Sequence, residues 1–316
     1  MRIVFFGSPV SALPSLEALL AAGHSIELVV TQPDKPAGRG RRLTPSPVKV
    51  AARELGLPVI EPVRIRTDPA AAERVRAARP DVNVVVAYGQ IIPHDIHVFP
   101  RYHSLNVHFS LLPKLRGAAP VQWTVLNGEA ESGISVIELN DRMDEGDILA
   151  QERVAVGPRE TAAALGSRLA GLGARLLVET LERIDRLEGR PQDHLQATLA
   201  PKIRKEDGLV IWADAAEAID RKVLALADRP GVFTRIKGRR VNIVRGRAVG
   251  PSACAGPQAG PPAGTVLSVG KAGLEVACGA ATSYLIEELQ PEGKAAMPAY
   301  AFSLGARIAP GDIIGV

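Results

Sequence analysis

Residues 82–87 of the chain read VNVVVA, a strongly β-branched run that is apolar throughout except for Asn83. Such side chains favour extended backbone, and an apolar run without alternation is typical of a strand covered on both faces. Strands buried in this way belong mainly to parallel sheets, whose crossover connections place helices on both sides. We therefore expect Val82–Ala87 to be a central strand of an open parallel sheet.

Strand-like and helix-like segments alternate around this run, through the first half of the chain. The expected strands are Arg2–Phe6, Ile26–Thr31, Ser104–Val107 and Gly133–Leu139. The expected helices are Leu13–Ala22, Pro47–Leu55 and Asp68–Ala78. Gly23 and Gly56 follow the first two helices as stop signals, and Ser46 precedes the second as a candidate N-cap. This rhythm predicts an α/β, Rossmann-like N-terminal domain built on an open parallel sheet.

The second half of the chain follows a different pattern. Apolar residues recur at intervals of three and four between Leu165 and Leu187, which predicts one long helix that Gly189 ends. Short strand-like segments then follow a polar stretch: Val232–Ile236, Arg240–Val244, Gly264–Val269, Leu274–Ala277 and Tyr284–Leu289. The predicted organisation is an α/β domain over residues 1–189, a linker over 190–205 and a small OB-like β-barrel domain over 206–316.

Composition is that of an ordinary globular protein, with 46% hydrophobic and 23% charged residues. Cys254 and Cys278 are too few for a disulfide framework or a four-cysteine zinc site. The apolar run at the N-terminus is too short for a signal peptide, and the sequence has no apolar run long enough to cross a membrane. We therefore expect a cytoplasmic protein with no membrane partner.

The net charge of +4 is unevenly placed. Residues 31–50 hold five basic residues against the single acid Asp34, and residues 201–247 hold 12 basic and 6 acidic residues. Basic clusters of this kind suit a phosphate backbone, although ordinary surface charge explains them equally well. With only 2 Trp, 4 Tyr and 6 Phe, stacking of bases on an aromatic platform is disfavoured.

Asn106 and His108 are the most informative polar pair. They lie two residues apart at the end of an expected strand, so their side chains leave it on the same side, where α/β proteins bind ligands. An amide donor beside an imidazole suits acyl transfer, in which one group stabilises the oxyanion and the other moves a proton. The alternative is a capping Asn and a half-buried His. Asp144 is placed to orient His108, unless it belongs to a solvated acidic turn.

Two further motifs favour no additional chemistry. Gly38–Arg42 lacks the spacing of a P-loop and of a dinucleotide-binding fingerprint, which disfavours a nucleotide-dependent oxidoreductase. His94 and His97 are spaced so that both could reach one metal ion, but the nearby His103 and His108 fall on opposite faces of a strand. We therefore expect no metal site.

The stretch NVHFSLLP at Asn106–Pro113, with Gly117 and Asp144, resembles the signature of folate-dependent formyltransferases. The resemblance extends over essentially the whole chain, through residues 31–49, 84–91, 116–122, 202–208 and 289–294. Residues 31–49 and the C-terminal segments look like the members of this family that act on methionyl-tRNA. Phe109 departs from the pattern, because the family usually has a small residue there, and its ring could narrow the folate site.

The resemblance implies a monomeric enzyme that transfers the formyl group of 10-formyltetrahydrofolate to the α-amine of initiator methionyl-tRNA. It implies that Asn106 and His108 hold the oxyanion and that Asp144 holds His108. The residues implied at the folate site are Ala87, Tyr88, Gly89, Gln90, Ile91, Ser110, Leu111, Leu112 and Pro113. The residues implied at the tRNA surface are Lys35, Arg39, Arg41, Arg42, Lys49, Lys202, Lys205, Arg239 and Arg240.

Two rival functions are compatible with the same residues. One is a related folate-dependent formyltransferase or hydrolase that acts on another amine, which residues 31–49 and the basic C-terminal region disfavour. The other is a catalytically weak RNA-binding relative in which Phe109 blocks the pocket. Saturable folate binding would separate an enzyme from that second rival.

Overall fold

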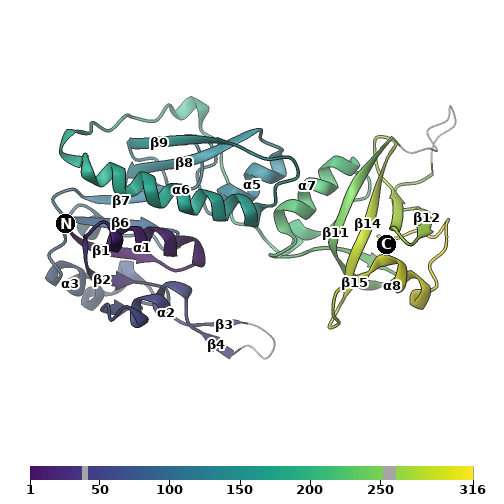
Figure 1. Ribbon diagram of the computed structural model, residues 1–316, viewed down its shortest axis with the longest axis horizontal. Helices are drawn as coiled ribbons and strands as arrows, with labels where there is room; N and C mark the ends of the chain where they lie inside the picture. Colours follow the sequence, from purple (N-terminus) through teal and green to yellow (C-terminus); the bar gives the residue numbers. More distant parts are fainter. Residues whose placement is uncertain (38–41, 252–260, 316) are drawn as a thin grey trace. The chain divides into compact units, whose positions relative to one another are not determined.

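The computed structural model describes residues 1–37, 42–251 and 261–315, and the chain forms two compact units (Figure 1). The first unit contains Met1–Val121, Ala130–Val156 and Ala164–Pro201. The second contains Gln122–Glu129, Gly157–Ala163 and Lys202–Val316. Among the described residues, no helix is both long enough and apolar enough to span a membrane. Each unit is organised around a β-sheet of its own.

The first unit is built on a seven-stranded sheet of order β5-β2-β1-β6-β7-β8-β9. Its strands are β1 (Arg2–Gly7), β2 (Ser25–Val30), β5 (Val59–Ile60), β6 (Val82–Val86), β7 (Ser104–His108), β8 (Glu131–Glu138) and β9 (Ile148–Ala155). The strands from β5 to β7 in this order run parallel, and β6 is buried at every position. The predicted central strand and the Rossmann-like fold are confirmed.

Most helices of the first unit occur where the sequence predicts them. They are α1 (Leu13–Ala21), α2 (Pro47–Glu54), α3 (Pro69–Ala77) and α6 (Ala162–Glu182), with a 3-10 turn at Ile184–Arg186 after α6. Ser46 is the predicted N-cap of α2, since its Oγ accepts a hydrogen bond from the Lys49 amide at 3.1 Å. The short helix α4 (His94–His97) was not predicted, and neither was the helix α5 (Pro120–Asn127), most of which belongs to the second unit.

Helix α6 packs against β7 and thereby sets which way the β7 side chains face. A Cβ atom on Gly173 of α6 would lie 2.9 Å from Val107 Cγ1, so Val107 points toward this helix. Side chains alternate along a strand. Asn106 and His108 therefore point to the opposite face of the sheet from α6.

The strand β8 departs from the predicted parallel sheet, because it runs antiparallel to β7 with Leu105 opposite Glu138 and His108 opposite Ser135. A short loop then leads into β9, which pairs antiparallel with β8. Antiparallel strands need only a short connection, whereas parallel strands need a crossover of a dozen or more residues. The strand β9 was missed because it is only partly buried and carries polar residues, as suits the edge of a sheet.

The second unit holds a sheet of order β10-β11-β14-β13-β12, with β15 paired to β14. Its strands are β10 (Val232–Ile236), β11 (Arg239–Pro251), β12 (Val266–Gly270), β13 (Gly273–Ala277), β14 (Thr282–Pro291) and β15 (Met297–Pro298). The helices α7 (Ala216–Leu226) and α8 (Ala299–Ala306) complete it and were not predicted. The five predicted strands are all present, and they pair antiparallel.

The two outer strands of this sheet are joined through the end of the chain. The amides of Gly311 and Ile314 donate to the carbonyls of Val266 and Gly264 beside β12, while the Gly315 amide donates to Arg235 on β10. Residues 311–315 thus hydrogen-bond along both edges of the sheet. This arrangement is compatible with the predicted OB-like barrel.

The predicted linker differs from the structure in its first part. Arg190 pairs with Ile148 and Leu199 pairs with Arg116, so residues 190–201 belong to the first unit, whose last residue is Pro201. The polar composition suggested a free linker because side chains alone do not show that the backbone of this stretch bonds to other strands.

The contact between α6 and β7 predicts opposite effects for two glycines of one helix. Gly171→Ala should raise the free energy of unfolding by about 0.5–1 kcal/mol, because alanine favours helix and a Cβ there meets nothing within 4 Å. Gly173→Ala should instead lower it by about 1–3 kcal/mol, because the new methyl group must displace the stiff Val107 side chain.

Urea unfolding followed by circular dichroism measures both variants. Equal stabilisation by the two substitutions would show that Val107 does not face α6, and would remove the argument for where Asn106 and His108 point.

Candidate active site

Three predicted catalytic residues, Asn106, His108 and Asp144, meet in the first unit. Asn106 and His108 on β7 are 9% and 5% exposed. Both face the Asp144 carboxylate: Asn106 Nδ2 donates to Asp144 Oδ1 at 3.3 Å, and His108 Nδ1 lies 3.6 Å from the same oxygen. The structure therefore brings together a buried amide, an imidazole and a carboxylate.

The path of the chain to Asp144 differs from the predicted one. We expected residues 140–147 to follow a parallel strand at the carboxyl edge of the sheet. Because β8 is antiparallel, its last residues lie beside the start of β7, where the Leu139 amide donates to the Ser104 carbonyl. The loop must then fold back along β7 to bring Asp144 to Asn106 and His108.

Two backbone features fix the Asp144 carboxylate. Its second oxygen, Oδ2, accepts a hydrogen bond from the Gly117 amide at 2.8 Å. Asp144 itself has a φ of 55°, in the left-handed region that Asp tolerates better than most residues. Gly117 has a φ of 124°, and a Cβ atom there would lie 2.7 Å from the Ala200 carbonyl oxygen. Only glycine fits at this hydrogen bond without displacing the backbone.

Both nitrogens of the His108 ring are placed by acceptors. Nε2 lies 2.9 Å from the Leu115 carbonyl oxygen, and since a carbonyl only accepts, Nε2 must carry a proton. Nδ1 is then the nitrogen that faces Asp144. The ring cannot rotate without losing both contacts, so the imidazole is held in one orientation before any ligand arrives.

A network that sequence reasoning missed holds the turn after Asp144. Gln192 donates from Nε2 to the carbonyls of Asp144 at 2.9 Å and Gly146 at 2.7 Å. Its Oε1 accepts from Arg116 Nε at 3.0 Å and Nη2 at 2.7 Å. The guanidinium of Arg116 also pairs with Glu145 at 3.2 Å. These residues lie far apart in the sequence, and a glutamine in a polar stretch gives no local signal of such a role.

The loop that follows His108 is braced from the neighbouring strands β8 and β9. Ser135 Oγ donates to the Ser110 carbonyl at 2.7 Å and accepts from the Leu112 amide at 3.0 Å. Gln151 Nε2 donates to the Leu112 carbonyl at 2.9 Å. The Leu112 side chain packs with Ile137 and Ile148. Of the residues predicted at the folate site, Leu112 and Ser110 thus hold the loop, whereas Leu111 and Pro113 remain partly exposed.

The predicted folate residues 87–91 also include some that support the loop from within and others that are exposed. Tyr88 is 1% exposed, and its ring meets Phe6 edge to face at 5.5 Å, so its side chain belongs to the core; this burial raises the pKa of its hydroxyl. Gln90 accepts from the Ile65 amide at 2.9 Å and donates to the Pro62 carbonyl at 3.1 Å. Ala87, Gly89 and Ile91 are exposed, and Ala87 and Gly89 have positive φ values of 49° and 79°.

Some cations of the first basic segment, residues 31–50, bond to other side chains of the protein. Lys49 is buried, and its Nζ lies 2.5 Å from Asp34 and 2.6 Å from Glu61. Hydrogen bonds to Asp34 and then Glu61 raise the pKa of Lys49, whose ammonium is therefore not available to a phosphate in this structure. Lys35 is exposed in the hairpin of β3 (Lys35–Ala37) and β4 (Arg42–Thr44) and donates to Gln32. Arg39 and Arg41 lie outside the described residues, and Arg42 begins β4.

The second basic segment also contains paired and exposed cations. Arg245 and Arg247 pair with Glu287 at 2.7 and 3.4 Å. The Arg240 guanidinium lies 3.7 Å from the centre of the Phe233 ring. Other predicted tRNA residues are exposed, namely Lys202, Lys205 and Arg239.

Two domain families match the chain: Formyl transferase over residues 1–181 and Formyl transferase, C-terminal domain, over residues 202–307. The methionyl-tRNA formyltransferase of Citrifermentans bemidjiense is 41% identical over 317 residues, which cover 100% of this chain and 96% of that protein. That of Myxococcus xanthus is 43% identical over 313 residues, which cover 98% of this chain and 97% of that protein.

A solved structure of an N-formyltransferase from Helicobacter canadensis, in complex with folinic acid and dTDP-3-aminofucose, has a TM-score of 0.65 to this chain. The match covers 92% of this chain and 99% of that one at 16% sequence identity. At this level of identity the likeness shows the fold alone.

The Gln192 network predicts that its loss loosens the Asp144 turn. Gln192→Leu leaves the carbonyls of Asp144 and Gly146 without their donor and should lower the free energy of unfolding by about 1–3 kcal/mol. The Gly117 amide, which is bonded to Asp144, should exchange its hydrogen faster. Urea unfolding and amide hydrogen exchange provide the two measurements.

The matched control is Gln196→Leu, since Gln196 is an exposed glutamine whose side chain bonds only to the nearby Asp193 in the described structure. It should leave both measurements close to those of the parent protein. An unchanged exchange rate at Gly117 in Gln192→Leu would mean that Gln192 does not hold the turn.

Proposed function

The chain belongs to the formyl transferase family, and with that membership as the premise we propose that it transfers the formyl group of 10-formyltetrahydrofolate to the α-amine of methionyl-tRNA. The observation that carries the chemistry is the convergence of Asn106, His108 and Asp144 on one face of β7. The acceptor is supported by full-length relatives named methionyl-tRNA formyltransferase at 41% and 43% identity.

The reaction makes specific demands on these side chains. The amine nitrogen attacks the formyl carbon, the carbonyl oxygen gains negative charge, and the nitrogen must lose a proton. The tetrahedral intermediate then collapses as the bond from the formyl carbon to N10 of the folate breaks, and N10 takes up a proton. The site must therefore stabilise an oxyanion and move one proton from the amine to the leaving nitrogen.

Asn106 is placed to stabilise the oxyanion. Its amide carries two N–H donors, of which one is used by Asp144 Oδ1 at 3.3 Å. The second is available to the developing oxyanion, and one such donor typically contributes about 2.7–4 kcal/mol to transition-state stabilisation. Because Asn106 is buried and already fixed by Asp144, little reorganisation is needed when charge develops.

His108 and Asp144 form the proton-handling pair. The ring is held by the Leu115 carbonyl at Nε2 and faces Asp144 with Nδ1. Asp144 positions the ring, and its negative charge stabilises the imidazolium that forms when Nδ1 takes up a second ring proton. Positioned acid–base groups of this kind typically accelerate a reaction about 10²–10⁴-fold.

The folate is proposed to lie beside the exposed parts of the two loops described above. Ala87, Gly89 and Ile91 supply one side, and Leu111 and Pro113 supply the other. Buried Tyr88, Ser110 and Leu112 and partly buried Gln90 support these loops from within. Phe109 is 9% exposed, so most of its ring is packed within the protein.

The direct test is formylation of initiator and elongator methionyl-tRNA with 10-formyltetrahydrofolate, with a nucleotide-linked amino sugar as a competing amine. Asp144→Asn should lower kcat about 10²–10⁴-fold, since an amide no longer holds His108 by charge, and should leave the Kd for tRNA nearly unchanged.

The control is Asp185→Asn, because Asp185 is an exposed carboxylate that pairs with Arg101 away from this site. It should retain full turnover. No formylation at high enzyme concentration would overturn the proposed function, and full turnover by Asp144→Asn would overturn the role given to Asp144.

Phosphate contacts by the second unit are proposed for its exposed cations. Arg239→Ala should weaken tRNA binding and reduce the slope of log K against log salt by about 1. Arg245→Ala removes the same charge, but its guanidinium is paired with Glu287 at 2.7 Å, and it should change the slope much less.

Fluorescence titration of tRNA at several salt concentrations measures these slopes. Equal changes for Arg239→Ala and Arg245→Ala would indicate a general effect of net charge instead of a phosphate contact at Arg239.

A further inference from the structure

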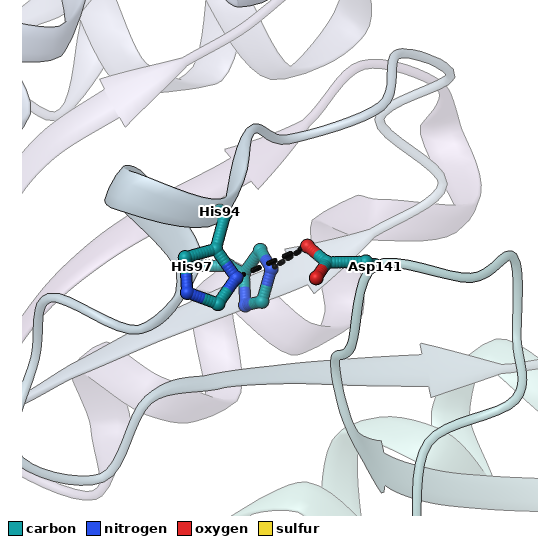
Figure 2. Close-up of side chains that lie close together, drawn as sticks. All are labelled: His94, His97 and Asp141. Atoms are coloured by element: carbon teal, nitrogen blue, oxygen red, sulfur yellow. Dashed lines mark hydrogen bonds and ion pairs between the residues drawn. The ribbon is translucent and has the colours of Figure 1, made fainter.

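A second cluster of chemistry-bearing side chains lies in the first unit and takes no part in the proposed reaction. It consists of His94 and His97 on α4 and Asp141 in the loop between β8 and β9 (Figure 2). His94 Nδ1 and His97 Nε2 each lie 3.1 Å from Asp141 Oδ1. The candidate ligand atoms all lie within 4.8 Å of one another.

The local backbone places these side chains together. Residues three apart on a helix share a face, so both imidazoles of α4 project the same way, with their ring centres 5.1 Å apart at 83°. Figure 2 shows both rings turned toward the Asp141 carboxylate. The His97 side chain is 3% exposed, whereas those of His94 and Asp141 are 67% and 68% exposed. One ligand is thus anchored in the protein, and the other two border solvent.

We propose that His94, His97 and Asp141 bind a divalent transition-metal ion, with Zn²⁺ as the best fit. Two imidazole nitrogens and one carboxylate oxygen are a donor set that Zn²⁺ accepts, with solvent completing the tetrahedron. Mg²⁺ and Ca²⁺ prefer sites made entirely of oxygen and are disfavoured here. Binding needs the Nδ1 lone pair of His94 and the Nε2 lone pair of His97, so each neutral ring carries its proton on its other nitrogen.

The second ring nitrogen of His97, which carries the proton when Nε2 binds the metal, limits the affinity for Zn²⁺. His97 Nδ1 is buried and has no hydrogen-bond partner within the described part of the chain. Metal-binding histidines usually donate this second N–H to a carboxylate or carbonyl, and loss of such a partner typically weakens metal binding about 10–100-fold. The site should therefore exchange its metal readily instead of holding it through purification.

Zn²⁺ here would tie α4 to the loop that carries Asp144. Asp141 lies three residues before Asp144 in the loop between β8 and β9, so the bound ion would link α4 to this loop. The histidine spacing alone did not reveal the site, because the third ligand is 44 residues from His97 in the sequence. Of the other two nearby histidines, His103 pairs with Glu138 at 2.5 Å and His108 belongs to the active site.

The test uses the full chain without a polyhistidine tag, stripped with a chelator and titrated with ZnCl₂ in a calorimeter at neutral pH. One equivalent should bind saturably. His94→Gln and Asp141→Asn should each weaken binding at least about tenfold, as expected for loss of one of three ligands. Both positions are exposed, so the variants should fold. The control His103→Gln removes an exposed histidine outside the cluster and should bind as the parent does.

A second measurement identifies the ligating atoms. Nitrogen-15 NMR of the imidazole rings should show Zn²⁺ shifting Nδ1 of His94 and Nε2 of His97 while the His103 ring stays unchanged. The proposal is overturned by the absence of saturable binding, by binding that survives both variants, or by shifts at other histidines alone. None of these measurements depends on formylation, so failure of the proposed function would leave them interpretable.

Discussion

The geometry of the candidate active site depends on the hydrogen bonds that hold the Asp144 carboxylate. Its side chain is 12% exposed, and a carboxylate so far removed from water is costly unless its oxygens are hydrogen-bonded. Asn106 donates to one oxygen and the Gly117 amide donates to the other. His108 Nδ1 faces the same oxygen as Asn106. The same contacts that stabilise this charge also fix the amide of Asn106 and the imidazole of His108, to which the proposed reaction assigns roles.

This constraint explains why two glycines stand where they do. At Gly117 a Cβ atom would come 2.7 Å from the Ala200 carbonyl, and at Gly146 it would come 1.6 Å from the Glu138 carbonyl. Any side chain at either position would displace backbone that contacts or carries Asp144. The antiparallel direction of β8 contributes to the same site. Because β8 ends beside the start of β7, the loop that follows must return along β7 to bring Asp144 to Asn106 and His108.

Sequence patterns were sufficient for the features that repeat locally. The buried run at β6, the N-cap Ser46 and the two-residue spacing of Asn106 and His108 each follow from the period of a strand or helix. They were not sufficient for features that depend on tertiary contacts, such as the direction of a strand or the burial of a side chain. The direction of β8 is set by its pairing with β7, because the connection over residues 109–130 contains a helix and is long enough for either direction. The burial of Tyr88 depends on Phe6 of β1. Gln192 has no periodic signal at all, because its role is defined by carbonyls distant in sequence.

The sequence also does not show which basic side chains are paired with acids in the folded protein. Counting residues assigns Lys49 to a basic cluster, yet its ammonium is enclosed by Asp34 and Glu61 and contributes little field outside the protein. Arg245 is similarly matched by Glu287, whereas Arg239 is exposed. A phosphate attracts the cations that remain unneutralised at the surface, since paired charges must first be separated at a cost in free energy. The cations of each basic segment that remain for the proposed tRNA contacts are therefore set by acids elsewhere in the sequence, which only the folded structure brings beside them.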